Sequence, residues 1–230
     1  MKTVKRFLPL FLILVGMGLA YGLGLGDYLS FETLKNNREA LLTYVEAHKI
    51  NALLIYAGVY TLVVVFSIPG ASFMTIAGGF LFGYVLGTSV VVLAATVGSI
   101  LLFLAARTAI GDTLKKKAGR WFQKMETGFQ KNQFNYLLTL RLIPLFPFFV
   151  VNVVPAFFGM KLLPYSLATF LGIIPGSFVY VSVGVGLGSV FETGATFSIH
   201  SVLTPQILLA LSGLALLSAI PLIHKIFRRS

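Results

Sequence analysis

Cysteine is absent from the 230 residues, and charged side chains are scarce. Without cysteine the chain cannot form disulfides, thiolate nucleophiles or cysteine-ligated metal centres. Asp, Glu, Lys and Arg together make up 11% of the sequence, whereas a soluble domain has about 25%. This shortage of charge excludes a soluble domain of useful size.

Motifs for catalysis or nucleotide binding are also missing. There is no Gly-rich phosphate loop ending in Lys-Ser/Thr, no His-Glu-x-x-His, and no pair of acidic residues embedded in an apolar stretch. His48, His200 and His224 all lie near predicted membrane edges, where histidine is typically an interfacial residue. We therefore predict a protein that is not an enzyme and that has no metal site and no cofactor.

Hydrophobic residues, by contrast, make up 57% of the chain, and its mean hydropathy is +0.91. These values are typical of an integral membrane protein. A chain of 230 residues can supply about five to seven helical spans of roughly 20 residues each. The composition predicts an all-α membrane protein with one compact membrane domain.

The net charge of +11 comes from basic residues in short loops beside apolar runs. In that position they report topology and contact with anionic lipid headgroups, so we do not expect nucleic-acid binding. Fourteen of the 18 Lys and Arg residues lie inside if both termini are cytoplasmic: three near the N-terminus, seven in a central loop, Lys161, and three near the C-terminus. We expect this orientation in a bacterial inner (plasma) membrane.

The first 50 residues divide into an apolar anchor and a mixed-charge segment. Residues 1–26 are predicted to be an N-terminal transmembrane anchor; cleavage as a signal peptide is the alternative. Residues 27–50 have apolar side chains at helical spacing, which predicts an amphipathic helix on the extracytoplasmic surface or, equally, an ordinary solvated connecting helix.

Residues 51–190 form the predicted core, which contains two similar units of opposite polarity. Each unit is a re-entrant helical hairpin followed by a transmembrane helix, so the core is predicted to be an inverted repeat. A C-terminal transmembrane helix follows. The predicted segments are hairpin 51–87, span 88–106, cytoplasmic basic loop 107–133, hairpin 134–160, span 162–190 and the helix 205–224.

The second hairpin contains the most unusual stretch, Thr139 to Met160. It combines one arginine, Arg141, with three prolines in an otherwise apolar sequence. Each proline removes a backbone donor, and hydrocarbon offers no water in compensation. Arginine at membrane depth costs roughly 2.5 to 3.5 kcal/mol on insertion scales, so this stretch indicates a site.

Arg141 is the main candidate for substrate binding, because a guanidinium binds phosphate with paired donors. The alternative is an arginine that caps exposed carbonyls or snorkels to the inner surface. Asn152 is a second candidate, or it satisfies carbonyls freed by prolines. Ser67 and Ser72, which flank the tip of the first hairpin, are also predicted to bind substrate. The residues expected to shape the hairpins are Pro69, Gly70, Gly79, Gly83, Pro144, Pro147, Pro155 and Gly159. The residues expected to attract lipid headgroups at the surface are Arg107, Lys115, Lys116 and Lys117.

Two motifs resemble a known family: Ile68-Pro-Gly70 with Phe80-Leu-Phe-Gly83, and Arg141-Leu-Ile-Pro-Leu-Phe-Pro147 followed by Asn152 and Gly159. They are similar to the DedA superfamily, above all to its SNARE-associated Golgi protein, or VTT-domain, branch. The resemblance implies opposed re-entrant hairpins and movement of lipids between leaflets, by scramblases or by transporters of polyprenyl phosphate. Several bacterial members have an embedded acidic residue early in the domain, whereas residues 50–106 here contain none, which argues against proton coupling.

Together these observations predict a flippase or scramblase for phosphate-bearing lipids such as phospholipid or polyprenyl phosphate. The expected partners are membrane lipids, anionic ones in particular, and a second copy of the chain in a homo-oligomer. One alternative is a proton- or ion-coupled transporter of small solutes. Another is a non-transporting scaffold in envelope maintenance.

Overall fold

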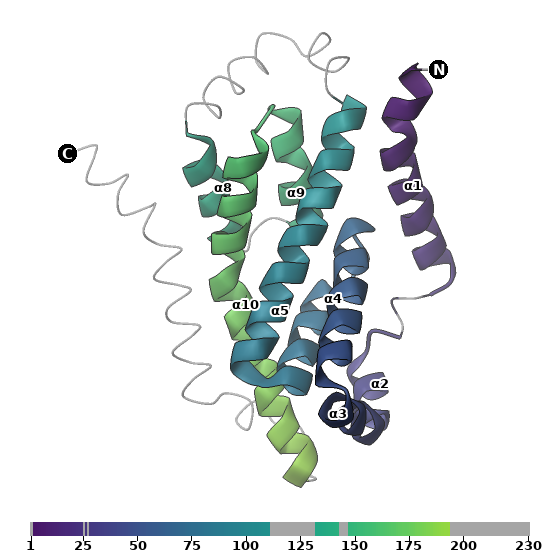
Figure 1. Ribbon diagram of the computed structural model, residues 1–230, viewed down its shortest axis with the longest axis vertical. Coiled ribbons are helices and arrows are strands. Elements are labelled where there is room, and N and C mark those ends of the chain that lie inside the picture. The colour runs from purple at the N-terminus through teal and green to yellow at the C-terminus, as the bar shows by residue number, and fades with distance from the viewer. Residues whose placement is uncertain (1, 25, 27, 111–131, 143–146, 194–230) are drawn as a thin grey trace, which may run out of the picture.

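The computed structural model describes residues 2–24, 26, 28–110, 132–142 and 147–193, and all regular elements in these ranges are helices (Figure 1). Pro144, the lysines at 115–117 and the predicted helix 205–224 lie outside the described residues. The helices are α1 (Lys2–Gly22), α2 (Phe31–Asn36), α3 (Arg38–Ala47), α4 (Lys49–Val65), α5 (Ala71–Ile110), α8 (Gln133–Leu142), α9 (Phe148–Phe157) and α10 (Leu162–Thr193).

Helix α4 and the start of α5 form an antiparallel pair joined by a turn at residues 66–70. The turn needs two left-handed residues, Ser67 (φ 50°) and Gly70 (φ 126°), and glycine adopts such angles without steric cost. The pair is held by two tyrosines of α4. The Tyr56 hydroxyl donates to the carbonyl of Met74, and the Tyr60 hydroxyl lies 2.9 Å from Thr75 Oγ1.

Helix α5 reverses direction at Gly83, where φ is 74° and ψ is −170°. A Cβ atom built on Gly87 would lie 2.7 Å from the carbonyl oxygen of Gly78, so the segments before and after Gly83 pack side by side. In a continuous helix these two residues would be about 13 Å apart along the axis. The sequence predicted the boundary between the second arm of the hairpin and the following span at residues 86–87. In the structure the chain reverses earlier, at Gly83. Glycine adopts this positive-φ conformation without the steric cost that other residues have.

The second half of the chain has a similar plan. Helices α8 and α9 are each 10 residues long, about 15 Å, and are therefore too short to cross a hydrocarbon core of about 30 Å. Gly159, with φ 66°, lies in the turn between α9 and α10, much as Gly83 ends the first short segment of α5. Two stretches are long and apolar enough to cross a membrane, Ala71–Thr108 and Leu162–Leu187, although the first reverses at Gly83.

Glycines allow the close helix contacts that hold this arrangement. A Cβ on Gly98 of α5 would lie 2.9 Å from the Thr61 carbonyl of α4, and a Cβ on Gly172 of α10 would lie 2.6 Å from Arg141 Cβ of α8. The short segment of α5 also packs on α10 backbone to backbone, because a Cβ on Gly79 would lie 2.8 Å from Val181 Cα.

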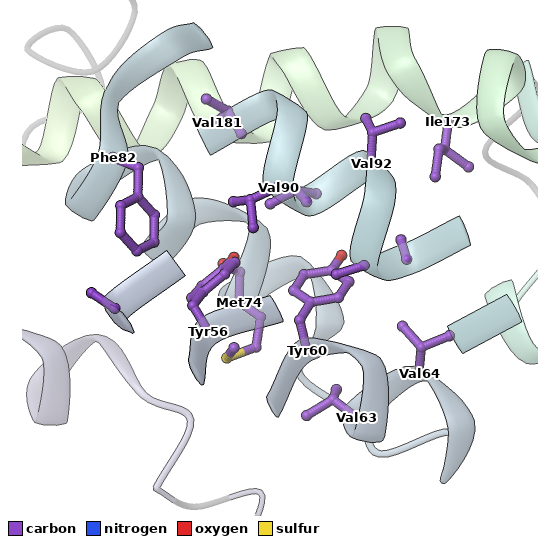
Figure 2. Packing of buried hydrophobic residues seen from close by; sticks show 14 residues of the cluster. Tyr56, Tyr60, Val63, Val64, Met74, Phe82, Val90, Val92, Ile173 and Val181 are labelled. Atoms are coloured by element: carbon purple, nitrogen blue, oxygen red, sulfur yellow. The ribbon is translucent and has the colours of Figure 1, made fainter. Parts of the chain in front are cut away.

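The largest buried cluster lies between α4, α5 and α10 (Figure 2). Tyr56 and Tyr60 lie next to each other on α4, with ring centroids 5.9 Å apart, and Val181 of α10 closes the cluster from the other side. The predicted amphipathic segment is split into α2 and α3 at Asn37, whose backbone N–H caps α2. Leu34 is the buried hydrophobic residue of α2 and α3, and Glu32, Lys35, Glu39 and Glu46 of these helices are exposed.

Candidate functional site

Arg141, in the last turn of α8, makes hydrogen bonds through one of its three guanidinium nitrogens. Nη2 donates to Asn152 Oδ1 at 2.6 Å and to Thr169 Oγ1 at 3.0 Å, and it lies 3.3 Å from the Tyr165 hydroxyl. The Phe148 ring faces the guanidinium at 5.0 Å from its centroid, at a distance suited to a cation–π contact. Arg141 is therefore held by α9 and α10, and all these contacts are with uncharged groups.

The other guanidinium nitrogens have no partner. Three buried side-chain nitrogen atoms lack a hydrogen bond in the described part of the chain, and they are Nε and Nη1 of Arg141 and Nδ2 of Asn152. All three are donors, so the cluster has an excess of N–H groups and lacks acceptors. An unsatisfied buried donor costs about 1 to 3 kcal/mol, and more when it is charged. Such a cluster is suited to an anion with several acceptor oxygens.

Tyr165 joins this cluster to α5. Its ring is fully buried and stacks on Phe103, with centroids 4.1 Å apart. Its hydroxyl donates to the Ser99 carbonyl at 3.1 Å while lying within reach of Arg141 and of Asn152 Oδ1, 3.2 Å away. Four helices, α5, α8, α9 and α10, are thus fixed at one point around the arginine.

Arg141 also lines a cavity of about 310 Å³. This cavity lies between α10, the start of α5 and the facing ends of α8 and α9, with Tyr60 of α4 in its lining. The side chains that give the wall its polar character are Tyr60, Ser72, Thr75, Arg141, Ser177 and Tyr180. One cation and five hydroxyls thus surround a space large enough for a small-molecule headgroup.

The family match covers the segment that builds this site. The VTT domain family matches residues 68–186, which is more than half of the chain. The chain belongs to the VTT domain family. Curated relatives include Transmembrane protein 41B of Rattus norvegicus, which is 30% identical over 191 residues (81% of this chain and 63% of the relative). The human protein of that name is 30% identical over 178 residues (76% and 61%), and the Danio rerio one is 29% identical over 185 residues (79% and 63%).

These relatives are transmembrane proteins by name, and they are longer than this chain, which spans a little under two thirds of the first of them. No solved structure matches the chain. The VTT domain, the membrane character and the SNARE-associated Golgi protein resemblance predicted from the sequence are confirmed by the family match and the relatives.

Within the VTT domain, the structure brings together three of the four residues predicted to contact substrate. Arg141 and Ser72 line the same cavity, and Asn152 is fully buried behind Arg141 and holds it. Ser67 lies in the turn before α5 and outside the cavity lining. Asn152 therefore contacts the arginine rather than the open space.

The predicted hairpin-shaping residues occupy several different positions. Pro69 is exposed in the first turn next to Gly70, Pro147 is the exposed N-cap of α9, and Pro155 is buried inside α9. Gly79 is a packing position against α10, whereas Gly70, Gly83 and Gly159 lie at turns with positive φ. Arg107 is exposed in the last turn of α5, away from the cavity lining.

Sequence reasoning missed the side chains that support Arg141 from distant parts of the chain. Tyr165, Thr169 and the Ser99 carbonyl lie 24, 28 and 42 residues from it in sequence. A repeated pattern did contain a signal, because Ala94 to Gly98 and Ala168 to Gly172 have the same Ala-to-Gly spacing. In the second copy the threonine after Ala168 is Thr169, a direct partner of Arg141.

Proposed function

We propose that this VTT-domain protein moves phosphate-bearing lipids between the leaflets of a membrane, and that Arg141 binds the phosphate. The observation that carries the proposal is that Arg141, which lines a cavity of about 310 Å³, has two guanidinium nitrogens without an acceptor among the described residues, with the equally partnerless Asn152 Nδ2 behind it. Phosphate oxygens are the acceptors that a guanidinium binds best. The lipid tails would remain in the hydrocarbon while the headgroup passes through the cavity.

We also propose that α4 with the short first segment of α5, and α8 with α9, are re-entrant hairpins that enter from opposite faces and form an inverted repeat. Three features support this reading: α8 and α9 are too short to span, the left-handed residues Gly83 and Gly159 follow the two short segments, and Gly98 and Gly172 pack in comparable ways. Transporters of this kind bind substrate near the midplane, where the two halves meet.

Passive transport is the form of this function that the sequence of the helices favours. Helices α4, α5, α8 and α9 contain no Asp or Glu, and the acidic residue of α10, Glu192, lies at the end of that helix, 12 residues after Tyr180 of the cavity lining. A proton-coupled carrier of small solutes would need such a group at membrane depth. We therefore expect flux that does not depend on a pH gradient.

The test is lipid exchange in vesicles reconstituted with purified protein. Fluorescent phosphatidylglycerol in the inner leaflet is protected from a membrane-impermeant quencher until it is moved outward. We expect the wild-type protein to expose it at least tenfold faster than empty vesicles do. A rate equal to that of empty vesicles would remove the proposal, and a rate that changes with an imposed pH gradient would favour the coupled carrier.

Two arginine variants locate the site. Arg141→Ala is expected to lower the flux to the level of empty vesicles, because the anion loses its only cationic partner in the cavity lining. Arg38→Ala, on α3 at the surface, removes the same charge and is expected to leave the flux within about twofold. Equal lipid-exchange rates in the Arg141→Ala and Arg38→Ala variants would mean that Arg141 has a structural role only.

A further inference from the structure

A second cavity, of about 470 Å³, lies on the other side of the α4–α5 pair, beneath α2 and α3. Its floor consists of apolar side chains from α4 and from the short segment of α5, including Ala52, Met74, Ala77 and Leu81. Its roof includes Leu34 and Leu41 from α2 and α3. We call this space the α3 pocket; it has the volume of a small-molecule site, for which 300 to 1,000 Å³ is typical.

Three polar side chains of the α3 pocket lining have partners within the protein, and the two other tyrosines of the lining, Tyr28 and Tyr44, are exposed. The Tyr56 hydroxyl donates to the Met74 carbonyl, Asn37 Nδ2 donates to the Thr33 carbonyl at 2.8 Å, and the Thr33 hydroxyl lies 2.9 Å from Ser30 Oγ. None of the buried, partnerless polar atoms in the described residues belongs to this lining. The α3 pocket therefore offers a ligand an apolar surface without buried polar atoms that lack a partner. In this it differs from the cavity at Arg141, whose lining residue Arg141 has two such atoms.

The α3 pocket opens onto the outer face of α4. Ile55 and Val59 belong to its lining and are 57% and 44% exposed. The same face continues through Leu54 and Leu62, which are 67% and 53% exposed. In a membrane protein an apolar helix face of this kind lies against lipid tails, so the pocket is continuous with the hydrocarbon surface.

We propose that the α3 pocket is a binding site for one acyl chain of a membrane phospholipid, separate from the lipid that passes Arg141. An apolar cavity stays dry and takes up apolar groups. Acyl chains are the apolar groups that lie against α4. The exposed rings of Tyr28 and Tyr44 at the pocket, 69% and 43% exposed, are suited to the boundary between tails and headgroups.

The two cavities share one wall. Tyr56 and Met74, which Figure 2 shows beside each other, line the α3 pocket. Tyr60, one helical turn after Tyr56, and Thr75, the residue after Met74, line the cavity at Arg141. The Tyr56 hydroxyl donates to the Met74 carbonyl and the Tyr60 hydroxyl bonds Thr75, so hydrogen bonds between α4 and α5 hold this wall. The acyl chain in the α3 pocket thus supports the wall from the side opposite the headgroup, and its binding does not depend on transport.

The experiment uses full-length protein in nanodiscs with two photoreactive phospholipids, one with a diazirine midway along an acyl chain and one with it on the headgroup. After irradiation, mass spectrometry maps the labelled peptides. We expect the acyl probe to label Met74 and Leu81 at least fivefold more than the headgroup probe does. Excess unlabelled phospholipid should suppress this labelling in a saturable way, while labelling at exposed Leu62 falls only in proportion to dilution.

Variants that fill or polarise the pocket decide the interpretation. Ala52→Leu with Ala77→Leu fills the space and is expected to reduce the labelling of Met74 at least fivefold, whereas Ala47→Leu, exposed on α3 and outside the lining, is expected to leave it unchanged. Leu81→Asn keeps the number and branching of the side-chain heavy atoms, makes the floor polar, and is expected to reduce labelling without any filling.

Two results would overturn the proposal. Labelling of Met74 that persists in the Leu81→Asn variant and in the filled variant would place the probe elsewhere on the surface. Labelling of Leu62 and Met74 with the same dilution behaviour would mean that only the general lipid layer had been detected. If the filled variant does not yield a monodisperse protein, the Leu81→Asn variant alone gives the answer.

Discussion

Replacing Asn152 with aspartate would change the charge beside Arg141 while keeping the shape of the side chain. Asn152 Oδ1 accepts a hydrogen bond from Arg141 Nη2 at 2.6 Å, and Asn152 Nδ2 is a buried donor without a partner. The Asn152→Asp variant turns that donor into an acceptor and gives the guanidinium an internal counter-ion. The arginine would then be paired within the protein, and an incoming phosphate would meet a negative charge.

The size of the effect follows from the geometry. An anion at Nε or Nη1 lies across the guanidinium from the new carboxylate. With an effective dielectric constant of about 20 and a separation of roughly 6 Å, the repulsion is about 3 kcal/mol, which lowers the affinity for the anion about a hundredfold. The same carboxylate stabilises a charge that the wild-type fold holds with neutral groups alone. We therefore expect the melting temperature to stay the same or to rise while transport is lost.

The assay combines lipid exchange in vesicles with thermal unfolding of the protein in detergent. Asn135→Asp is the matched control, since it adds the same charge on α8 at an exposed position and is expected to preserve the flux. An Asn152→Asp protein that is folded and moves anionic phospholipid at the wild-type rate would refute the reasoning. A protein that loses both folding and flux would show that Asn152 is a structural partner only.

Three other substitutions test the fold around the site. Gly184→Ala should lower the free energy of unfolding by about 1 to 3 kcal/mol, because its Cβ would meet the backbone of α5; Gly176→Ala, with open space around it, should be neutral or stabilising. Gly83→Ala should lower the free energy of unfolding by about 1 to 2 kcal/mol because of its positive φ alone, since no atom lies within 4 Å of a Cβ built at this position. Gly58→Ala, which also has open space around its Cβ but no positive φ, should not lower it. Tyr165→Phe keeps the stacked ring but removes the hydroxyl beside Arg141, so it should lower flux several-fold with a stability loss of about 1 kcal/mol. Chemical denaturation measures the first two, and flux with denaturation measures the third.

Local sequence signals predicted the turns and the unusual charge. Proline and glycine at 69–70 and the arginine at 141 stand out in an apolar background, because each has a cost in lipid that the rest of the sequence does not have. The apolar composition predicted helices, and the segment lengths placed most of them. The positions of the first turn and of the candidate site could therefore be predicted from a few residues that are unusual in an apolar sequence.

The supports of the site could not be read in this way. Tyr165 is one of nine tyrosines, and nothing near it in sequence indicates that it reaches Arg141 or Ser99. Whether Asn152 holds a headgroup or another side chain depends on which helix lies opposite, which is a long-range property of the packing. The position of the reversal in α5 was ambiguous for a similar reason, since both Gly83 and Gly87 are available and only the packed structure distinguishes a turn glycine from a contact glycine.

The backbone contact between α10 and the short segment of α5 has a mechanical consequence. At Gly79 and Gly184 no side chain lies between the two helices, so neither can slide past the other without a collision of main-chain atoms. The two elements must move as one rigid body. Helix α8 meets α10 through the Cβ and Cγ atoms of Arg141 at Gly172, so side-chain atoms rather than two main chains form this contact. A change in the width of the cavity would therefore require α8 and α9 to shift relative to α5 and α10, and such a shift would first have to break the hydrogen bonds of Arg141.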